Sequence, residues 1–295
     1  MTRPAVIDGS LVLEGQHDTY YYHQDNYFIG ITKPLRARGA SGQEYVLKRR
    51  SPFPYGFEQE KKIYELLANA GGHVSLMPPL ELVPTVDDEF LVFSYLPGED
   101  LVDVVLREKR LSPHELSTVF KPLCPAVDFL HHLGIVHRDL TMENIRLPSS
   151  SFPIQRDYFT VPTLDLRLYD FNCSVTNAFD SVSVADDAAG SPHYLAPESF
   201  AYKRADWRVD LYALAVMAFR VLTGEFPFES AQDDAVMLMI EIGNKSLHQP
   251  IPHTTIINSA LPAASDDFFY KGLAKNPEER FQTAVEFYEA FCTLL

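Results

Sequence analysis

Strand patterns are concentrated near the start of the chain. Short runs rich in aromatic and β-branched residues, bounded by turn signals, predict strands there. These runs are residues 19–23, 27–31 and 44–48, and the turn signals between them are Asp25-Asn26 and Ser41-Gly42. A further run at residues 89–95 predicts another strand.

Helical spacing of apolar residues predicts helices in other parts of the chain. The first helix would cover residues 57–70 and would end at Gly71-Gly72. A capping box at residues 112–115 would begin a second helix. Residues 208–224 are apolar at nearly every position, so their helix would be buried on all sides. A last helix would start at Thr283, and its expected inward-facing residues are Val285, Tyr288, Phe291 and Cys292.

Composition and charge narrow the class of protein. The chain has 295 residues, of which 46% are apolar, so it can bury a sizeable core. Its 25 basic and 40 acidic residues give a net charge of −15. An excess of negative charge argues against nucleic acid or an anionic membrane as the main partner.

The cysteines and the apolar segments predict a cytoplasmic protein. Three cysteines without metal-binding spacing indicate a reducing compartment. The first residues lead into no apolar segment, so no signal peptide is expected. The longest apolar stretch, residues 211–222, is interrupted by Arg220 and is too short to span a bilayer.

Residues 137–144 carry the strongest candidate chemistry. They read His-Arg-Asp-Leu-Thr-Met-Glu-Asn, so Asp139 and Asn144 stand in one short loop. Phosphoryl transfer depends on positioning and on neutralising charge. A carboxylate that accepts a hydroxyl proton and an amide oxygen that holds a metal ion would meet that need.

The segment resembles the catalytic loop of protein kinases, H-R-D-L-x-x-x-N. Further motifs of this family occur in family order: Tyr45-Val46-Leu47-Lys48, Glu60, Asp170-Phe171-Asn172, Gly190–Glu198 with its Ala196-Pro197-Glu198 ending, Asp210 and Arg280. The resemblance implies an α+β, bilobal protein kinase-like fold in one domain over residues 1–295.

The resemblance also implies boundaries within that domain. A β-rich small lobe would cover residues 1–96, with a hinge near 94–98. A larger helical lobe would cover residues 97–295. Residues 148–163 are rich in proline and serine and would form an inserted surface loop.

ATP and Mg²⁺ are the cofactors that the resemblance implies. Asp139 would be the catalytic base, and Asn144 and Asp170 would hold the metal ion. Lys48 would hold the α- and β-phosphates. Glu60 would fix Lys48 by an ion pair, with Glu58 as the alternative partner.

The remaining nucleotide contacts would come from main-chain groups. Groups near Ser94 and Leu96, in the hinge, would bind adenine. The glycine-rich loop of the family has three glycines, but only Gly30 is present here. Where other residues replace glycine, their side chains obstruct a close approach of the backbone to the phosphates, so weaker nucleotide binding is expected.

The segment from Asp170 to Glu198 would form the activation segment. By resemblance, Ser191 would lie near Asp139 and help to select serine or threonine hydroxyls. Glu198 would form a buried ion pair with Arg280. Arg138 would pair with negative charge in the segment, and the candidates are the phosphosites Ser181 and Ser183 or the acids Asp186 and Asp187.

Three functions remain open from the sequence. The first is a serine/threonine protein kinase that acts on a protein hydroxyl. The second is a pseudokinase that acts as a binding or scaffold module, because Thr141 and Asn172 replace the usual lysine and glycine. The third is a small-molecule kinase of the same fold, which the Ala196-Pro197-Glu198 ending disfavours.

Overall fold

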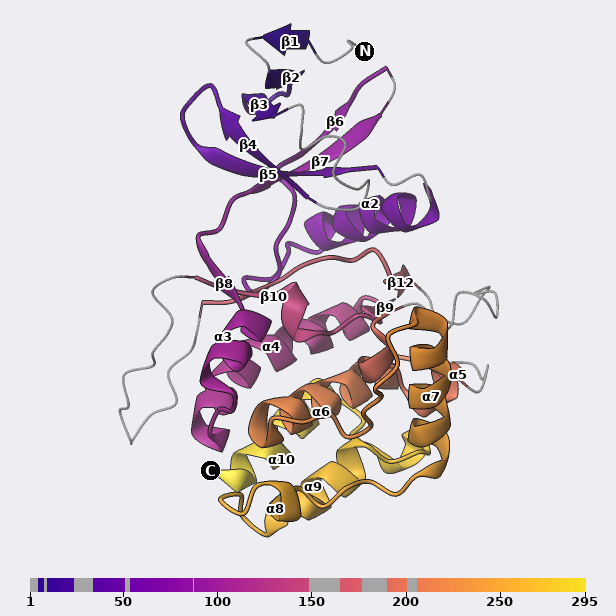
Figure 1. Ribbon diagram of the computed structural model, residues 1–295. Helices are drawn as coiled ribbons and strands as arrows, with labels where there is room; N and C mark the ends of the chain where they lie inside the picture. The colour runs from indigo at the N-terminus through magenta and orange to yellow at the C-terminus, as the bar shows by residue number, and fades with distance from the viewer. Residues whose placement is uncertain are drawn as a thin grey trace. The chain divides into compact units, whose positions relative to one another are not determined.

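The chain forms two compact units in the computed structural model, which describes residues 5–7, 10–23, 34–50, 54–86, 88–148, 165–176, 190–200 and 206–295 (Figure 1). The first unit comprises residues 1–72 and 77–97, and the second comprises residues 73–76 and 98–295. The first is a sheet with one helix and the second is mostly helical. The predicted α+β class is therefore confirmed.

The first unit contains an antiparallel sheet in the order β1-β2-β3-β4-β5-β7-β6. Its strands are β1 (Ala5–Ile7), β2 (Ser10–Glu14), β3 (Thr19–His23), β4 (Leu35–Gly39), β5 (Glu44–Arg49), β6 (Glu81–Pro84) and β7 (Glu89–Ser94). Alternate residues point to opposite faces of a strand, so one face can be apolar. In β4 this alternation is complete, because Leu35, Ala37 and Gly39 are buried while Arg36 and Arg38 are exposed.

Tyrosines fill much of the core of this sheet. Tyr20 and Tyr45 meet edge to face with ring centroids 4.9 Å apart, and Tyr22 lies 6.0 Å from Phe90. The Tyr20 hydroxyl donates a hydrogen bond of 2.5 Å to Glu81 Oε1. A buried phenol needs such a partner. Burial raises the pKa of Tyr20 far above its usual value, and the hydrogen bond to Glu81 adds to this effect.

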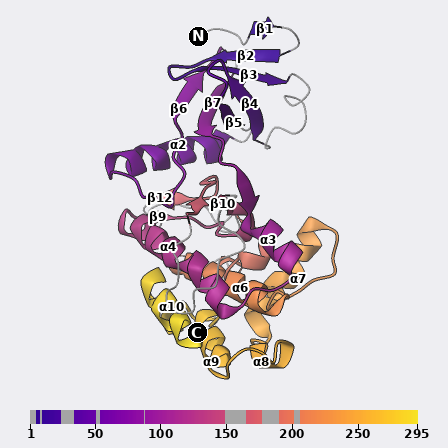
Figure 2. The same ribbon diagram turned by 90° about the vertical axis from the view of Figure 1, so that its left-hand side faces the viewer.

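Helix α2 (Pro54–Asn69) completes the first unit beside the sheet (Figures 1 and 2). Its buried residues Phe57, Ile63, Tyr64 and Leu67 recur at helical spacing. Gly71 and Gly72 follow with φ of +85° and +69°, and the Gly72 amide donates to the Leu67 carbonyl. This left-handed ending is the helix stop that the two glycines predict.

Over its described residues, the second unit consists of helices and five short strands in two small sheets. Its helices are α3 (Leu101–Glu108), α4 (Pro113–His132), α5 (Pro197–Phe200), α6 (Arg208–Thr223), α7 (Ala235–His248), α8 (Thr254–Ile257), α9 (Ala264–Gly272) and α10 (Ala284–Phe291), with 3₁₀ turns η1 (Met142–Asn144), η2 (Pro192–Tyr194), η3 (Pro277–Glu279) and η4 (Cys292–Leu294). Its strands are β8 (Gly98–Asp100), β9 (Ile135–Val136), β10 (Ile145–Pro148), β11 (Arg167–Leu168) and β12 (Val175–Thr176), which pair as β11-β10-β8 and β12-β9.

Helix α6 is the buried centre of the second unit. Fourteen of its residues are buried, as its almost uniformly apolar sequence predicts. Gly224 ends it with φ of +82°. Aromatic rings form a second part of the core, where Phe120 meets Phe287 and Phe291 edge to face. Within the described residues, every helix is too short or too polar to cross a membrane.

Several predicted elements differ from the observed ones. Strand β4 was not predicted, and it is β4 that precedes the Ser41-Gly42 turn. The strand and turn expected within residues 25–31 lie outside the described residues. In α10 the buried residues include Ala284 and Phe287, whereas Val285, predicted to face inward, is 38% exposed. Apolar residues occur on more than one side of α10, so their spacing alone does not decide which side is buried.

Candidate functional site

Lys48 and Glu60 form an ion pair inside the first unit. Lys48 lies on β5 and Glu60 on α2, and Lys48 Nζ is 2.8 Å from Glu60 Oε1. The Glu60 side chain is fully buried and that of Lys48 is 13% exposed. Tyr64, one turn further along α2, donates its hydroxyl to the same carboxylate oxygen at 3.5 Å. The pair holds the ammonium group at a fixed place on the sheet.

The structure decides between the two candidate partners of Lys48. Glu58 lies on a more exposed part of α2, where its side chain is 45% exposed and pairs with Lys61 at 3.4 Å. Lys61 also contacts Glu89, at 3.1 Å. Glu58 therefore belongs to a surface network, and Glu60 is the glutamate that contacts Lys48.

The predicted adenine-binding residues lie at the end of β7. Ser94 pairs with Tyr45 in the sheet, and the Tyr95 amide donates to the Glu44 carbonyl at 3.1 Å. Ser94 and Leu96 are both partly exposed. Phe93 is buried, with its ring centroid 5.7 Å from that of Tyr64. The helix that carries Glu60 thus also packs on the residue that precedes Ser94.

In the second unit, Asp210 of α6 fixes the backbone of residues 137–144, the segment that the sequence predicts to be the catalytic loop. Its carboxylate accepts hydrogen bonds from the amides of His137 and Arg138 at 2.9 and 2.8 Å, and from His131 Nε2 at 2.8 Å. Arg138 has φ of +66°, an unfavourable conformation for arginine. The bonds to the rigid central helix hold the loop in this conformation.

Burial controls the protonation of the groups under the loop. Burial by itself would raise the pKa of Asp210, but the hydrogen bond from His131 and the nearby His137 outweigh it and hold that pKa below its usual value. Burial lowers the pKa of His137, although the surrounding carboxylates oppose this effect. His137 is fully buried and its ring lies 5.0 Å from that of Phe171. We therefore expect a neutral imidazole and an ionised Asp210 near neutral pH.

Asp139 is held by hydrogen bonds at both carboxylate oxygens. The Ser191 amide and hydroxyl both donate to Asp139 Oδ1 at 3.0 Å. Asn144 Nδ2 donates to Asp139 Oδ2 at 3.0 Å and to the Asp139 carbonyl at 2.9 Å. The expected proximity of Ser191 and Asp139 is therefore present, and it fixes the rotamer of the carboxylate.

Gly190 allows Ser191 to reach Asp139. Its φ is +119°, and a Cβ at this position would lie 2.6 Å from the Arg138 carbonyl oxygen. Real Cβ atoms do not approach an oxygen so closely, so only glycine fits here. Gly190 thus connects the conformation of the catalytic loop to the position of Ser191.

Asp170 follows a segment that is bonded to the catalytic loop. The Tyr169 amide donates to the Asn144 carbonyl at 3.1 Å, and His137 Nε2 lies 3.3 Å from the Tyr169 carbonyl oxygen. Asp170 itself has φ of +66°. Asn172 does not have a positive φ, so the left-handed residue of this turn is Asp170, and aspartate is among the residues that tolerate this conformation best.

Asn144 and Asp170 suit a magnesium ion that binds mainly to phosphates. The Asn144 amide nitrogen faces Asp139, so the side-chain oxygen is the atom left to act as a ligand. Mg²⁺ takes one or two protein oxygens and completes its shell with phosphate and water. In the described part of the chain, no three histidine, cysteine or acidic side chains form a metal-binding group.

The predicted ion pair between Glu198 and Arg280 is present and buried. Two hydrogen bonds of 2.7 and 2.6 Å join the guanidinium group to the carboxylate. Arg280 Nε also donates to the Ala274 carbonyl at 2.8 Å, and the guanidinium group lies 4.9 Å from the centre of the Tyr212 ring. This pair connects the end of the Gly190–Glu198 segment to the core beside α6.

Some predicted residues cannot be placed and one contributor was missed. Gly30, the phosphosite candidates Ser181 and Ser183, the acids Asp186 and Asp187, and almost all of the loop over residues 148–163 lie outside the described residues. His131, which holds Asp210, was not predicted. Its only sequence signal is a histidine near the end of the helix before the loop, which is too common to be informative.

Known proteins resemble this chain over much of its length. The family model described as Protein kinase domain matches residues 56–290. The serine/threonine-protein kinase PknE of Mycobacterium tuberculosis is 27% identical over 186 residues, 63% of this chain and 29% of PknE. The serine/threonine-protein kinase PknB of the same species is 32% identical over 199 residues, 67% of this chain and 29% of PknB. The chain thus spans less than a third of the length of these relatives.

The family match includes candidate site residues from both units. It covers Glu60, Asp139, Asn144 and Asp170, whereas Lys48 lies before the matched residues. Lys48 is connected to the matched region by its ion pair with Glu60. The matched segment includes most of the chain, and its motifs occur in the order of the family. The chain belongs to the protein kinase domain family.

Proposed function

We propose that this chain is a serine/threonine protein kinase that transfers the γ-phosphate of ATP to a hydroxyl group of a protein. The observation that carries the proposal is the arrangement around Asp139. Its carboxylate accepts bonds from Ser191 and Asn144, in a loop that Asp210 fixes to the central helix. These bonds orient the carboxylate at both oxygens, as a group that positions a hydroxyl and accepts its proton requires.

In the proposed reaction, Asp139 positions the substrate hydroxyl and accepts its proton. The transition state of phosphoryl transfer is loose, so orientation contributes more than basicity. The donors on Oδ1 and Oδ2 restrict the rotation of the carboxylate. Ser191 lies directly beside Asp139, where it would contact an incoming serine or threonine side chain.

Lys48, Asn144 and Asp170 would hold the nucleotide. Mg²⁺, held by Asn144 and Asp170, would neutralise negative charge that develops on the phosphates. Lys48 would bind the α- and β-phosphates, and Glu60 would keep its ammonium group in place. Ser94 and Leu96 would bind adenine through main-chain groups. Gly30, as the single glycine of its loop, would make nucleotide binding weaker than in family members with three glycines.

The test combines binding of nucleotide with transfer of phosphate. Thermal unfolding is measured with and without Mg²⁺-ATP, and transfer of radiolabelled phosphate to a basic test protein is then followed. We expect stabilisation by nucleotide and transfer, with transfer lost in Asp139→Asn. Asp233→Asn is the matched control, because Asp233 is exposed and far along the chain from the site residues.

The outcomes separate an enzyme from a binding module. Binding of nucleotide without transfer, or transfer that persists in Asp139→Asn, would contradict the proposal. Stabilisation by a protein partner and never by nucleotide would favour a pseudokinase. The protein nature of the substrate and a cytoplasmic location are part of the same proposal, and none of the three cysteines, all of which lie in the described residues, is in a disulfide.

A further inference from the structure

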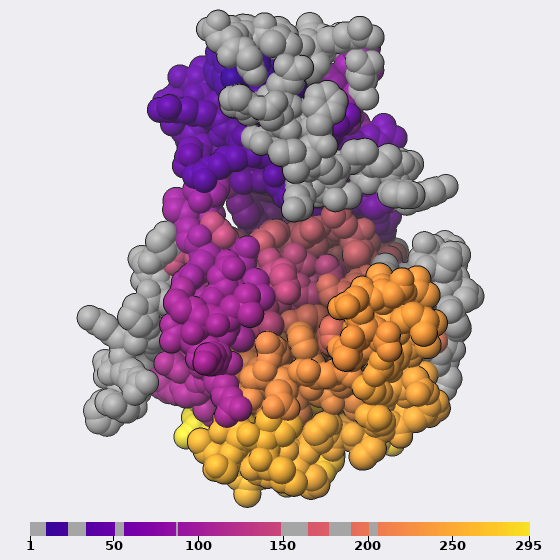
Figure 3. Space-filling view, viewed as in Figure 1, coloured from indigo at the N-terminus to yellow at the C-terminus, as the bar shows by residue number. Residues whose placement is uncertain are grey.

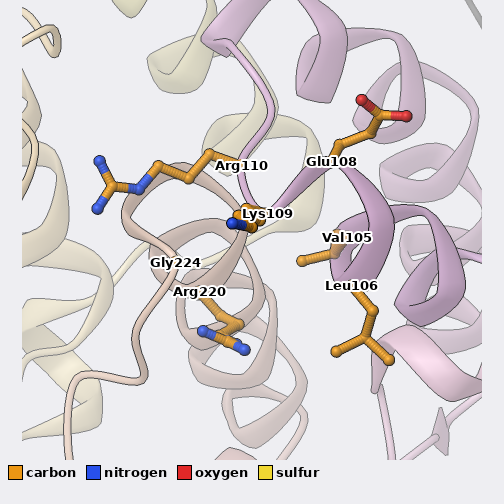
Figure 4. A pocket seen from close by; sticks show the side chains of 7 residues that line it. All are labelled: Val105, Leu106, Glu108, Lys109, Arg110, Arg220 and Gly224. Carbon is orange, nitrogen blue, oxygen red and sulfur yellow. The ribbon is translucent and has the colours of Figure 1, made fainter.

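A basic hollow lies in the second unit between the end of α3 and the end of α6 (Figure 4). Its volume is about 470 Å³, and it is lined by Val105, Leu106, Glu108, Lys109, Arg110, Arg220 and Gly224. Figure 3 shows the magenta surface of α3 next to orange surface of the second unit on one face of the molecule. The function proposed above assigns no role to this hollow.

Three cationic side chains gather in the hollow without an acidic partner. Lys109 and Arg110 are exposed and Arg220 is partly exposed, and none of the three forms an ion pair with another described residue. The carboxylate of Glu108 points away from them (Figure 4) and lies 2.9 Å from Arg107 Nε. On a chain with a net charge of −15, three neighbouring cations without an acidic partner are unusual.

The backbone around the hollow is fixed by hydrogen bonds. The Leu111 amide donates to the Val221 carbonyl at 3.0 Å, which joins the segment after α3 to the end of α6. The Gly224 amide donates to the Arg220 carbonyl at 2.9 Å. A Cβ on Gly224 would lie 3.1 Å from Arg110 Nε, so the arginine side chain packs directly over this glycine. These hydrogen bonds fix the backbone that surrounds the hollow, and the packing over Gly224 gives the Arg110 side chain a defined position.

A chain of contacts leads from the hollow to Asp139. The Arg220 guanidinium group lies 5.2 Å from the centre of the Phe226 ring. The Phe226 ring stacks on His193, with centroids 4.3 Å apart. His193 belongs to η2, which begins directly after Ser191, and Ser191 donates to Asp139. All of these residues lie in the second unit, so the hollow and the reacting carboxylate share one rigid framework.

We propose that this hollow binds an acidic segment of the protein substrate while Asp139 acts on a hydroxyl of the same polypeptide. The inference rests on the proposed kinase function and names the class of substrate. Carboxylate side chains of the segment would pair with Lys109, Arg110 and Arg220, and its apolar side chains would contact Val105 and Leu106.

The size and walls of the hollow favour a peptide over a small anion. A volume of about 470 Å³ is in the range of sites that hold several groups of a ligand. Leu106 is 65% exposed beside the cations, so an apolar contact is available next to the charged ones. A peptide carries both kinds of group, whereas a free phosphate ion carries only charge.

The experiment measures binding separately from transfer. Two fluorescent peptides with the same serine acceptor are compared, one with glutamates beside the acceptor and the other with glutamines at the same positions. Their affinities are measured by fluorescence anisotropy for the unmodified chain and for Lys109→Gln/Arg110→Gln. The control is Arg38→Gln/Lys62→Gln, which changes the net charge equally through exposed residues of the first unit.

We expect the acidic peptide to bind more tightly than its twin and to lose about tenfold in affinity in the Lys109→Gln/Arg110→Gln variant alone. Equal affinities of the two peptides, or equal losses in both double variants, would overturn the proposal. A stabilising effect of inorganic phosphate that requires Lys109 and Arg110, with no preference for the acidic peptide, would assign the hollow to a small anion instead. Peptide binding is measured without phosphate transfer, so its result can be interpreted even if the chain transfers no phosphate.

Discussion

The two units each bury an ion pair, and the two pairs are built differently. In the helical unit, Arg280 and Glu198 form two parallel hydrogen bonds, and the Arg280 side chain is fully buried. In the sheet unit, the ammonium group at the end of the flexible Lys48 side chain contacts Glu60, and this side chain is 13% exposed. The difference follows the chemistry of the two cations, because guanidinium binds carboxylate as a planar fork and ammonium does not.

The two pairs also differ in how far they are closed off from solvent. Arg280 directs its donors to Glu198 and to main-chain carbonyls, so the pair is sealed inside the protein. Lys48 retains access to solvent and can contact a bound anion without leaving Glu60. We therefore expect loss of the first pair to lower the stability of the chain and loss of the second to lower its activity.

The largest expected effect is on stability, from Glu198→Ala. This change leaves Arg280 buried without its partner, and arginine cannot lose its proton. The free energy of unfolding should fall by about 3–5 kcal/mol, as measured by urea unfolding followed by circular dichroism. Glu278→Ala, which removes an acid that pairs with Arg208 at the surface, should change it little. Equal losses of unfolding free energy in the two variants would contradict the role of the buried pair in stability.

Lys48→Met should act mainly on activity. Transfer of phosphate should fall at least about a hundredfold in kcat/KM, because a cation that stabilises the phosphates is lost. The loss of stability should be smaller than in Glu198→Ala, since buried Glu60 can take up a proton when its partner is absent. A variant that unfolds as readily as Glu198→Ala, or that keeps full activity, would contradict this division of roles.

Glu60→Gln should have a smaller effect than Lys48→Met. The amide oxygen can still accept a bond from Lys48 while the charge is lost, so we expect kcat/KM to fall about tenfold. Glu58→Gln is the matched control on the same helix, and it should leave activity unchanged because Glu58 contacts Lys61. Steady-state kinetics of both variants would show which glutamate supports the lysine, and a larger effect at Glu58 would refute the assignment.

The smallest expected effect is a change in the pH dependence of stability, from replacing Asp210, which is buried like the two ion pairs. The pKa of Asp210 is held below its ordinary value of 3.8. Its contribution to stability is therefore complete above that value and is lost as the pH falls through the lower pKa of the folded state. In Asp210→Asn the unfolding free energy should depend less steeply on pH on the acid side. An unchanged slope in urea unfolding at a series of acidic pH values would show that Asp210 does not carry this contribution.

Elements with a strong local sequence pattern were predicted correctly, whereas elements whose sequence fits more than one kind of structure were not. Helix α6 was predicted because a run with almost no polar residues has only one stable location, the core. The glycine stop after α2 was predicted because left-handed backbone favours glycine. Strand β4 was missed because its sequence Leu-Arg-Ala-Arg-Gly contains no β-branched or aromatic residue.

The sequence by itself determined the family, the α+β class and the identity of the residues expected to act, because ordered motifs and short-range patterns are properties of the chain. Only the tertiary structure decided that Glu60 and not Glu58 contacts Lys48, that His131 supports Asp210, and that Lys109, Arg110 and Arg220 surround one hollow. Such contacts join residues that are far apart in the chain, and a hydrogen bond or an ion pair depends on distances of a few ångströms that spacing along a sequence does not specify.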